Sequence, residues 1–350
     1  MRREEGRTVA VFGAYGHTGR FVVAELRARG FVPVLSGRDA VKLRSLAQDF
    51  PGAEVRPASV DDPGSLDRAL AGADAVINCA GPFAVTAAPV IEAALRAGIP
   101  YVDVAAEIEA NADTFTRFAD RAREADAVIL PAMAFYGGLG DLLATAALGE
   151  GTAADAVDIA YGLSGWHPTE GTRIAGAVSR QRRGGRRVRY TGGRLAYDDS
   201  EPTRLKWRFP EPLGAREVVA EFTMADVVTI PSHLDVPEVR THMAVEAATD
   251  LSAPDTPAPT ATDDQGRSDQ TFLVEAVVRA DGVEHRAVAR GRDIYAVTAP
   301  LAVEAVHHIL TGRTRTTGVT SAGALFDAPE FLRALAPHIE FEVLGDRTVS

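Results

Sequence analysis

Short apolar, β-branched runs alternate with helix-period segments between residues 8 and 131, and this alternation constrains the fold more than any other feature. The runs lie at residues 8–12, 31–35, 53–56, 73–79, 101–104 and 127–130. Strands that are joined through helices pair in parallel, because each crossover brings the chain back to the same edge of the sheet. The pattern therefore predicts an α/β fold with a doubly wound parallel sheet.

The pattern changes after Gly151, where longer runs of alternating apolar and polar residues are separated by turn residues. Residues 270–280 and 283–289 flank Asp281-Gly282, which predicts a β-hairpin. Residues 252–268 are rich in Pro, Thr, Ala and Asp and predict a solvated loop, whereas residues 299–310 and 330–335 have helical spacing. A length of 350 residues also fits two domains, so we expect a second, mainly antiparallel α+β domain.

The composition excludes several classes of partner and mechanism. A net charge of −11 argues against a general electrostatic grip on nucleic acid or on an anionic membrane surface. Lys42 and Lys206 are the two lysines, and the residues four positions before them are Arg38 and Pro202, so a Tyr-x-x-x-Lys proton relay is excluded. One cysteine cannot form an intrachain disulfide, and no Cys/His group has zinc-ligand spacing, so no metal is expected.

The start of the chain bears on its location. Residues 1–5 are mostly charged, but the apolar run that follows is short and leads directly into a glycine motif, which indicates a strand rather than an export signal. No run of about 18 apolar residues is present to cross a membrane. We therefore expect a cytoplasmic protein whose partner is a small-molecule substrate.

A glycine motif follows the first predicted strand and opens the first predicted helix. Its residues are Gly13, Ala14, Tyr15, Gly16, His17, Thr18 and Gly19. In a dinucleotide-binding turn the first glycine permits the tight turn, the second lets backbone N–H groups approach a pyrophosphate, and the third lets the helix pack closely on the strand. The context of strand, motif and helix favours this function over a plain strand-to-helix turn.

The end of the second predicted strand indicates which dinucleotide binds. Ser36 and Arg38 stand where an NAD enzyme usually carries Asp or Glu, and a hydroxyl and a guanidinium can bind a 2′-phosphate. NADP(H) is therefore the predicted cofactor, although Arg38 could instead be a solvated charge beside a helix cap at Asp39. Ser59 and Asp61 follow the third strand and are expected to meet the adenine, unless Asp61 caps a helix.

The fourth predicted strand ends on small residues against which a nicotinamide ribose could lie. These residues are Cys79, Ala80, Gly81, Pro82 and Phe83. In doubly wound sheets ligands bind outside the carboxyl ends of the strands. Nothing nearby in the sequence would lower the pKa of Cys79, so it is expected to be a small packing residue rather than a nucleophile.

Several of these motifs together resemble the saccharopine dehydrogenase-like oxidoreductases, a family that includes saccharopine reductase and trans-acting enoyl reductases. The similar stretches are residues 11–19, 36–38, 78–83, 101–103 and 291–300. The resemblance implies an NADP-dependent oxidoreductase with a Rossmann domain at residues 1–150. It also implies a substrate and dimerisation domain at residues 151–298 and C-terminal helices at residues 299–350 that return to the first domain.

The remaining chemistry must come from side chains near the carboxyl edge of the first sheet. Candidates there are carboxylates and phenols, namely Tyr101, Asp103, Glu107, Tyr136 and Asp141. This set fits a protonated imine slightly better than an alkoxide, so we predict reduction of a C=N bond, with Tyr136, Asp141 and the loop residue His167 as catalytic candidates. The alternatives are a C=C or C=O reductase and a non-catalytic NADP-binding sensor.

Two further features were left open by the sequence. Asp141 could equally cap a helix that begins near Leu142, and His167 could be merely exposed. The arginine-rich residues 180–187 could bind an acidic substrate or a carrier protein, but such runs are usually solvated. A homodimer is a further expectation.

Overall fold

The first sheet is parallel throughout and has the strand order β15-β6-β5-β4-β1-β2-β3. It is seen in a computed structural model that describes residues 6–348, so the charged start at residues 1–5 lies outside the described residues. The strands are β1 (Thr8–Phe12), β2 (Val32–Gly37), β3 (Glu54–Pro57), β4 (Ala75–Asn78), β5 (Tyr101–Asp103), β6 (Val128–Leu130) and β15 (Gly318–Val319). The predicted doubly wound sheet is confirmed, in the order typical of dinucleotide-binding domains.

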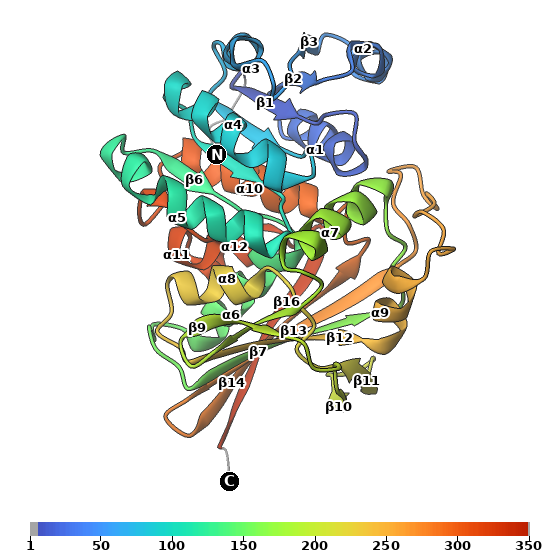
Figure 1. Ribbon diagram of the computed structural model, residues 1–350, viewed down its shortest axis with the longest axis vertical. Helices are drawn as coiled ribbons and strands as arrows, with labels where there is room; N and C mark the ends of the chain where they lie inside the picture. Colours follow the sequence, from blue (N-terminus) through green and yellow to red (C-terminus); the bar gives the residue numbers. More distant parts are fainter. Residues whose placement is uncertain (1–5, 349–350) are drawn as a thin grey trace.

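Helices cover both faces of this sheet, in the upper part of Figure 1. They are α1 (His17–Ala28), α2 (Ala40–Asp49), α3 (Pro63–Leu70), α4 (Phe83–Ala97) and α5 (Ile108–Glu124). Their starts follow from the sequence, because the Asp39 carboxylate accepts from the first N–H groups of α2 and the Asp62 carboxylate accepts from Ser65 N in α3. Gly98, with φ of 66°, ends α4 in the left-handed conformation.

The second sheet has the order β10-β11-β12-β7-β13-β14-β16, with β8 and β9 attached to β12. The strands are β7 (Ala156–Leu163), β8 (Arg187–Thr191), β9 (Arg194–Asp198), β10 (Arg204–Arg208), β11 (Ala215–Val219), β12 (Glu238–Ala244), β13 (Thr271–Ala280), β14 (Val283–Arg292) and β16 (Ile339–Thr348). The predicted hairpin is β13 and β14. Pairing is antiparallel except between β12 and β7, so the expected mainly antiparallel domain is confirmed.

The remaining helices lie between the two sheets or pack on one of them. They are the π-helical turn η1 (Phe135–Leu139), α6 (Gly140–Leu148), α7 (Glu170–Arg182), α8 (Asp226–Thr229), the 3-10 turn η2 (Ile230–Ser232), α9 (Val245–Ser252), α10 (Thr298–Leu310), α11 (Ala322–Leu325) and α12 (Ala328–Ala334). In Figure 1, α7 lies between the layer of the first sheet and the layer of the second. Residues 253–270, within which most of the predicted solvated loop falls, contain no helix or strand.

The C-terminal segment differs from a purely helical return to the first domain. Helix α10 packs against α1, and β15 adds a strand to the first sheet. Strand β16, however, pairs along β14 in the second sheet, from Ile339 opposite Gly291 to Thr348 opposite Val283. The outer edge of β14 offers unpaired backbone groups that a helix could not satisfy, so the last strand joins the second domain.

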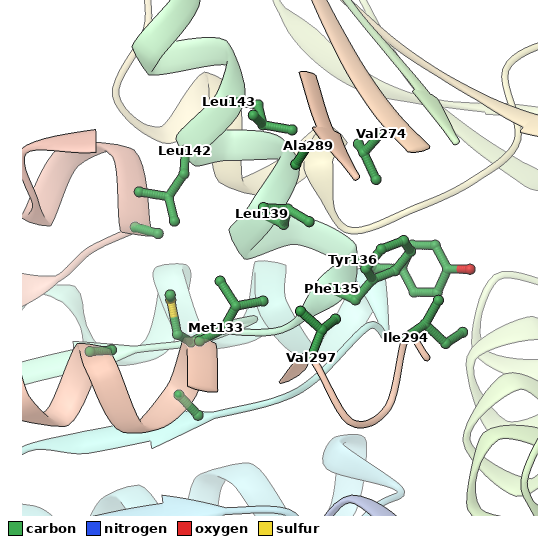
Figure 2. Close-up of a cluster of buried hydrophobic side chains, with 14 of the residues drawn as sticks. Met133, Phe135, Tyr136, Leu139, Leu142, Leu143, Val274, Ala289, Ile294 and Val297 are labelled. Carbon is green, nitrogen blue, oxygen red and sulfur yellow. The ribbon is translucent and has the colours of Figure 1, made fainter. Parts of the chain in front are cut away.

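The hydrophobic core is continuous between the two sheets. One buried cluster contains Val11 of β1, Val274 of β13 and the residues that connect them. Figure 2 shows its central part, where Phe135, Leu139 and Leu142 of η1 and α6 meet residues of β13, of β14 and of the turn before α10. Within residues 6–348, no helix combines the length and apolar character needed to span a bilayer.

Candidate cofactor and substrate cleft

A cleft of about 1610 Å³ runs along the carboxyl edge of the first sheet and into the second domain. The first sheet contributes the loops after β1, β2, β3, β4, β5 and β6. The second domain contributes α7, β11, α9 and the loop around Tyr295. Ligands of doubly wound sheets bind at this edge, so the cleft is the candidate functional site.

The glycine turn at the start of the cleft has the geometry of a phosphate cradle. Gly13 has φ of 87°, and a Cβ there would lie 2.7 Å from Ala80 N, so the loops after β1 and β4 approach too closely for a side chain. A Cβ at Gly19 would collide with the carbonyl oxygen of Gly13. Gly16 has φ of −66° and begins α1 without a side-chain cap among the described residues, which leaves first-turn N–H groups available to an anion. These features fit a bound pyrophosphate.

The structure divides the predicted residues of this motif into two groups. Gly13, Tyr15, Gly16, His17 and Thr18 line the cleft. Ala14 and Gly19 are buried under the turn and pack against it instead of facing the cleft. Their contribution is to bring α1 close to β1, which positions the N-terminus of the helix.

Positive charge gathers at the cleft end that lies beyond β2. Arg38 is exposed and lines the cleft, as predicted for a residue that contacts a 2′-phosphate. Lys42 lines it as well, with its Nζ 5.7 Å from the centroid of the Tyr15 ring. The sequence interpretation missed Lys42, although its position one helical turn after Arg38 was a usable signal. Ser59 and Asp61 line the same end of the cleft.

Ser36 is a correction to the predicted cofactor contacts. Its side chain is fully buried, and its hydroxyl has no hydrogen-bond partner among the described residues. Its carbonyl oxygen accepts from Gly13 N at 2.8 Å and from Ala14 N at 3.1 Å. Side chains alternate across a strand, and this alternation turns Ser36 inward, so it shapes the glycine turn through its backbone and does not meet a phosphate.

The loop after β4 forms the wall expected to face a nicotinamide ribose, and Cys79, Ala80, Gly81, Pro82 and Phe83 all line the cleft. Behind the loop, Asn78 Oδ1 accepts from Ala80 N at 3.0 Å. Burial, and to a lesser degree the negative charge of Asp103, raises the pKa of the Cys79 thiol, which agrees with the prediction that it is not a nucleophile.

A buried carboxylate fixes the neighbouring strands. Asp103 accepts from Ala105 N at 3.0 Å, from Ala132 N at 2.9 Å and from the Tyr101 hydroxyl at 2.8 Å. Burial outweighs these hydrogen bonds and raises the pKa of Asp103 to about 6. Asp103 and Tyr101 do not line the cleft, so they support its wall and do not contact a ligand.

Glu107 does line the cleft, and it caps α4. Its carboxylate accepts from Phe83 N at 2.6 Å and from Ala84 N at 3.1 Å, although it lies 24 residues away from Phe83 in sequence. Burial raises the pKa of Glu107 despite these two hydrogen bonds. The carboxylate therefore fixes the loop of residues 79–83 against the start of α5.

Tyr136 is the predicted catalytic residue that the structure brings into the cleft. Its ring packs against Phe135, Tyr161 and Trp166, with centroids 4.8, 5.0 and 4.9 Å away. Its hydroxyl has no hydrogen-bond partner among the described residues, and Figure 2 shows the hydroxyl oxygen directed away from the apolar cluster. Burial, more than the charges of Tyr295 and Asp226, raises the pKa of Tyr136, so the phenol stays protonated and can donate a proton.

Asp141 does not reach the cleft, contrary to the catalytic prediction. It is fully buried in α6, where it accepts from Gly323 N at 2.7 Å and lies 2.7 Å from His233 Nε2. Burial opposes the charge on His233, but the charge and hydrogen bond of Asp141 prevail and raise the pKa of His233. The Asp141 side chain lies on the side of α6 that faces away from the cleft. It joins α6 to η2 and α11 and has no contact with the cleft.

His167 is also absent from the cleft lining. Its backbone N donates to Gln270 Oε1 at 2.8 Å, and its side chain is half-buried. Its neighbours Trp166 and Thr169 line the cleft instead. The prediction of a proton-donating imidazole at this position is therefore not supported by its placement.

Tyr295 is a cleft residue that the sequence interpretation did not single out. Its hydroxyl accepts from Trp166 Nε1 at 3.1 Å and from Thr169 N at 3.2 Å, and lies 3.0 Å from Thr172 Oγ1. Its ring contacts His17 of the glycine turn at 5.2 Å between centroids. Tyr295 thus connects the start of α7 to the glycine turn, and only its place in the late motif at residues 291–300 could have indicated this.

Comparison with known proteins identifies the first domain. Residues 9–130 match the family model for the saccharopine dehydrogenase NADP binding domain. Residues 9–130 are thus similar to the NADP-binding domain of this family. NADP(H) as cofactor and the saccharopine dehydrogenase-like resemblance, both predicted from the sequence, are therefore confirmed.

Curated relatives match a part of this chain of similar size. The chain is 30% identical over 142 residues to a "Probable mitochondrial saccharopine dehydrogenase-like oxidoreductase" of Arabidopsis thaliana and 26% identical over 145 residues to a saccharopine dehydrogenase-like oxidoreductase of Bos taurus. Each match covers 36% of this chain. It spans about a third of the length of each relative, 31% of the Arabidopsis protein and 34% of the Bos taurus protein. The class of oxidoreductase predicted from the sequence is thus the class of these relatives.

A solved structure shares the whole fold. An apo saccharopine dehydrogenase (L-Glu forming) from Saccharomyces cerevisiae superposes with a TM-score of 0.65 over 97% of this chain and 100% of the other, at 14% identity. The saccharopine dehydrogenase NADP-binding domain and the second sheet therefore occur together in both chains. At this identity the similarity concerns the fold alone.

The expected cytoplasmic location is contradicted by the relatives. The Arabidopsis protein is named mitochondrial, and a "Lipid droplet localized protein" of Caenorhabditis elegans is 32% identical over 111 residues. The expectation rested on finding no export signal and no membrane-spanning segment in the sequence. Those two features do not distinguish the cytoplasm from other locations in the cell.

Proposed function

We propose that the protein is an NADPH-dependent reductase that transfers hydride to a C=N bond of a small molecule. The observation that carries the proposal is one continuous cleft, which joins the glycine turn and Arg38 to Tyr136. NADPH supplies hydride at C4 of its nicotinamide when it is bound. The protein must then hold both reactants in register and manage one proton.

Binding of the cofactor is assigned to groups of the first domain. The first-turn N–H groups of α1 would hold the pyrophosphate, and Arg38 with Lys42 would hold the 2′-phosphate. Ser59 and Asp61 would meet the adenine end, and the loop of residues 79–83 would carry the nicotinamide ribose. The Glu107 cap keeps that loop at a fixed distance from the sheet.

The proton is assigned to Tyr136, whose unpartnered hydroxyl can donate to the atom that gains negative charge. A C=N substrate is favoured because Tyr136 can protonate the imine nitrogen as hydride reaches the carbon, and the Glu107 carboxylate lines the cleft to stabilise the positive charge that develops there. The protonated phenol also favours a second candidate, a C=C or C=O reductase, because an enolate or alkoxide needs an acid.

The test is NADPH oxidation, followed by absorbance, with a panel of cyclic imines, enones and ketones. The proposal predicts turnover with imines above the background rate without protein. Turnover with enones or ketones alone would select the second candidate. Tight NADPH binding without turnover of any member would favour a non-catalytic sensor.

The partners follow from the same proposal. A small-molecule substrate is the primary partner, and nucleic acid and membrane are not among the expected ones. A homodimer through the second sheet stays a prediction, and so does a carrier protein near residues 180–187. Within that run, Arg182 pairs with Asp113 at 2.7 Å and Arg187 with Asp198 at 2.7 Å, so part of its charge is already neutralised.

A further inference from the structure

We infer that the substrate of this cleft has a sizeable apolar body, which binds against the second domain beside the nicotinamide end. The inference rests on the proposed function for the identity of the reaction. It names the class of molecule that the same cleft selects. The argument uses the size of the cleft, the residues of one wall and the exposure of two side chains.

The cleft is larger than one ligand requires. Its volume of about 1610 Å³ exceeds the roughly 300–1,000 Å³ of most small-molecule sites. The first-domain loops that line it account for the groups a dinucleotide needs, from Gly13 to Phe83. The space bounded by the second domain is therefore available to a second molecule.

That second-domain wall is apolar. It comes from three elements and the turn after β11, and its large apolar side chains are Ile174, Val219, Phe222, Met224, Val245 and Leu251. Thr223 lies among them, but its hydroxyl already forms hydrogen bonds within the protein. It accepts from Val188 N at 3.0 Å and donates to Val188 O at 3.3 Å. A compact polar substrate would find few free partners along this wall.

Two of the arginines that reach the same part of the cleft, Arg183 and Arg187, are paired, whereas Arg204 of β10 is exposed. Arg187 contacts the Asp198 carboxylate at 2.7 Å, and Arg183 donates to Ser179 Oγ at 2.8 Å and lies 3.6 Å from Glu109. An acidic substrate would have to displace these carboxylates. The wall is therefore suited to apolar surface rather than to anionic groups.

Two large apolar side chains in the cleft lie exposed. Val85 of α4 is 55% exposed and Ile174 of α7 is 47% exposed, and both line the cleft. They belong to different domains, and α4 contacts α7. Exposed apolar surface within a cavity gains free energy when a ligand covers it, at about 25 cal/mol per Å². This surface would be covered by the apolar body of a substrate.

The experiment measures apolar binding without relying on turnover. The neutral fluorescent probe N-phenyl-1-naphthylamine is bound to the NADPH-loaded protein and displaced by linear alcohols from butanol to decanol. We expect the inhibition constant to fall up to about fourfold per added CH2, the value for one buried methylene, until the wall is filled. A constant that does not change with chain length would overturn the inference.

A matched pair of variants locates the binding surface. Ile174→Asp places a charge on the wall and should weaken decanol by about tenfold or more. Val343→Asp places the same charge on an exposed apolar residue of β16, 49% exposed and outside the cleft, and should leave decanol binding unchanged. Equal effects of the two variants would contradict the assignment to this wall.

The outcomes separate this inference from the proposed function. Inhibition constants that fall with alcohol chain length, without turnover of any panel member, would support the apolar substrate site and contradict the reductase function. Turnover of small polar imines with no dependence on chain length, together with absent probe binding, would keep the reductase and remove the apolar substrate.

Discussion

At the scale of single residues, Arg38 is the residue that we propose determines which dinucleotide the cleft prefers. Its guanidinium is exposed at the end of the cleft beyond β2, beside Lys42. Arg38→Ala should weaken NADPH by about 1.5–3 kcal/mol, the usual value of a hydrogen bond to a charged group, and leave NADH nearly unchanged. Calorimetric titration with both cofactors measures the difference.

Arg44 provides the control for this prediction. It is exposed on α2, the helix that follows Arg38, but does not line the cleft. Arg44→Ala should leave both affinities as in the wild type. An equal loss in the two variants would mean that general charge, and not the position of Arg38, holds the 2′-phosphate.

Tyr136 supplies the proton in the proposed reaction. General acid catalysis contributes about 10²–10⁴-fold, so Tyr136→Phe should lower turnover at least about a hundredfold without changing NADPH affinity. The protein should keep its melting temperature, because the lost hydroxyl has no hydrogen-bond partner among residues 6–348. A loss of only a few fold in single-turnover experiments would instead indicate an already protonated iminium substrate.

At the scale of elements, Gly13 and Gly16 of the glycine turn should respond differently to substitution. Gly16 has an ordinary φ of −66°, and a Cβ there would lie 3.2 Å from Gly13 O, so Gly16→Val should fold but fill the space of the pyrophosphate and abolish NADPH binding. Gly13→Val should instead destabilise the fold, because φ is 87° and Ala80 stands in the way. Melting temperature and NADPH affinity, measured on both variants, separate the two roles. Unchanged affinity in Gly16→Val would refute the phosphate cradle.

Helix α6 is held to η2 and α11 by the buried pair of Asp141 and His233. Asp141→Asn removes the charge that stabilises protonated His233 and should lower the free energy of unfolding by about 1–3 kcal/mol. Turnover should survive, because the pair lies outside the cleft. An Asp141→Asn variant with the wild-type melting temperature but without turnover would contradict this structural role and indicate a catalytic one.

At the scale of the whole molecule, the first domain was predictable to within a few residues. Its strands are short runs of β-branched and apolar residues that end at Gly, Asp or Pro, and helix caps such as Asp39 and Asp62 are local signals. Strand β16 was not predictable, because its strand state depends on pairing with β14. The two paired residues nearest in sequence, Gly291 and Ile339, are 48 residues apart.

The site was predictable where function depends on backbone and not where it depends on the direction of a side chain. Gly13 and Gly16 could be placed because a turn and a helix start fix their geometry. Ser36 and Asp141 lie near the right strand ends but point inward, and sequence alone does not say which side of an element faces the cleft. Tyr295 enters from a distant segment, so only the folded chain brings it to His17.

Transfer of hydride from NADPH to substrate is the central claim, and isotope transfer tests it most directly. NADPH that carries deuterium at the transferable C4 position is incubated with the protein and the best imine of the panel, and the product is analysed by mass spectrometry. The account predicts a product one mass unit heavier, with the deuterium on the former C=N carbon. A product without deuterium, or NADPH that binds and stays unoxidised, would contradict it.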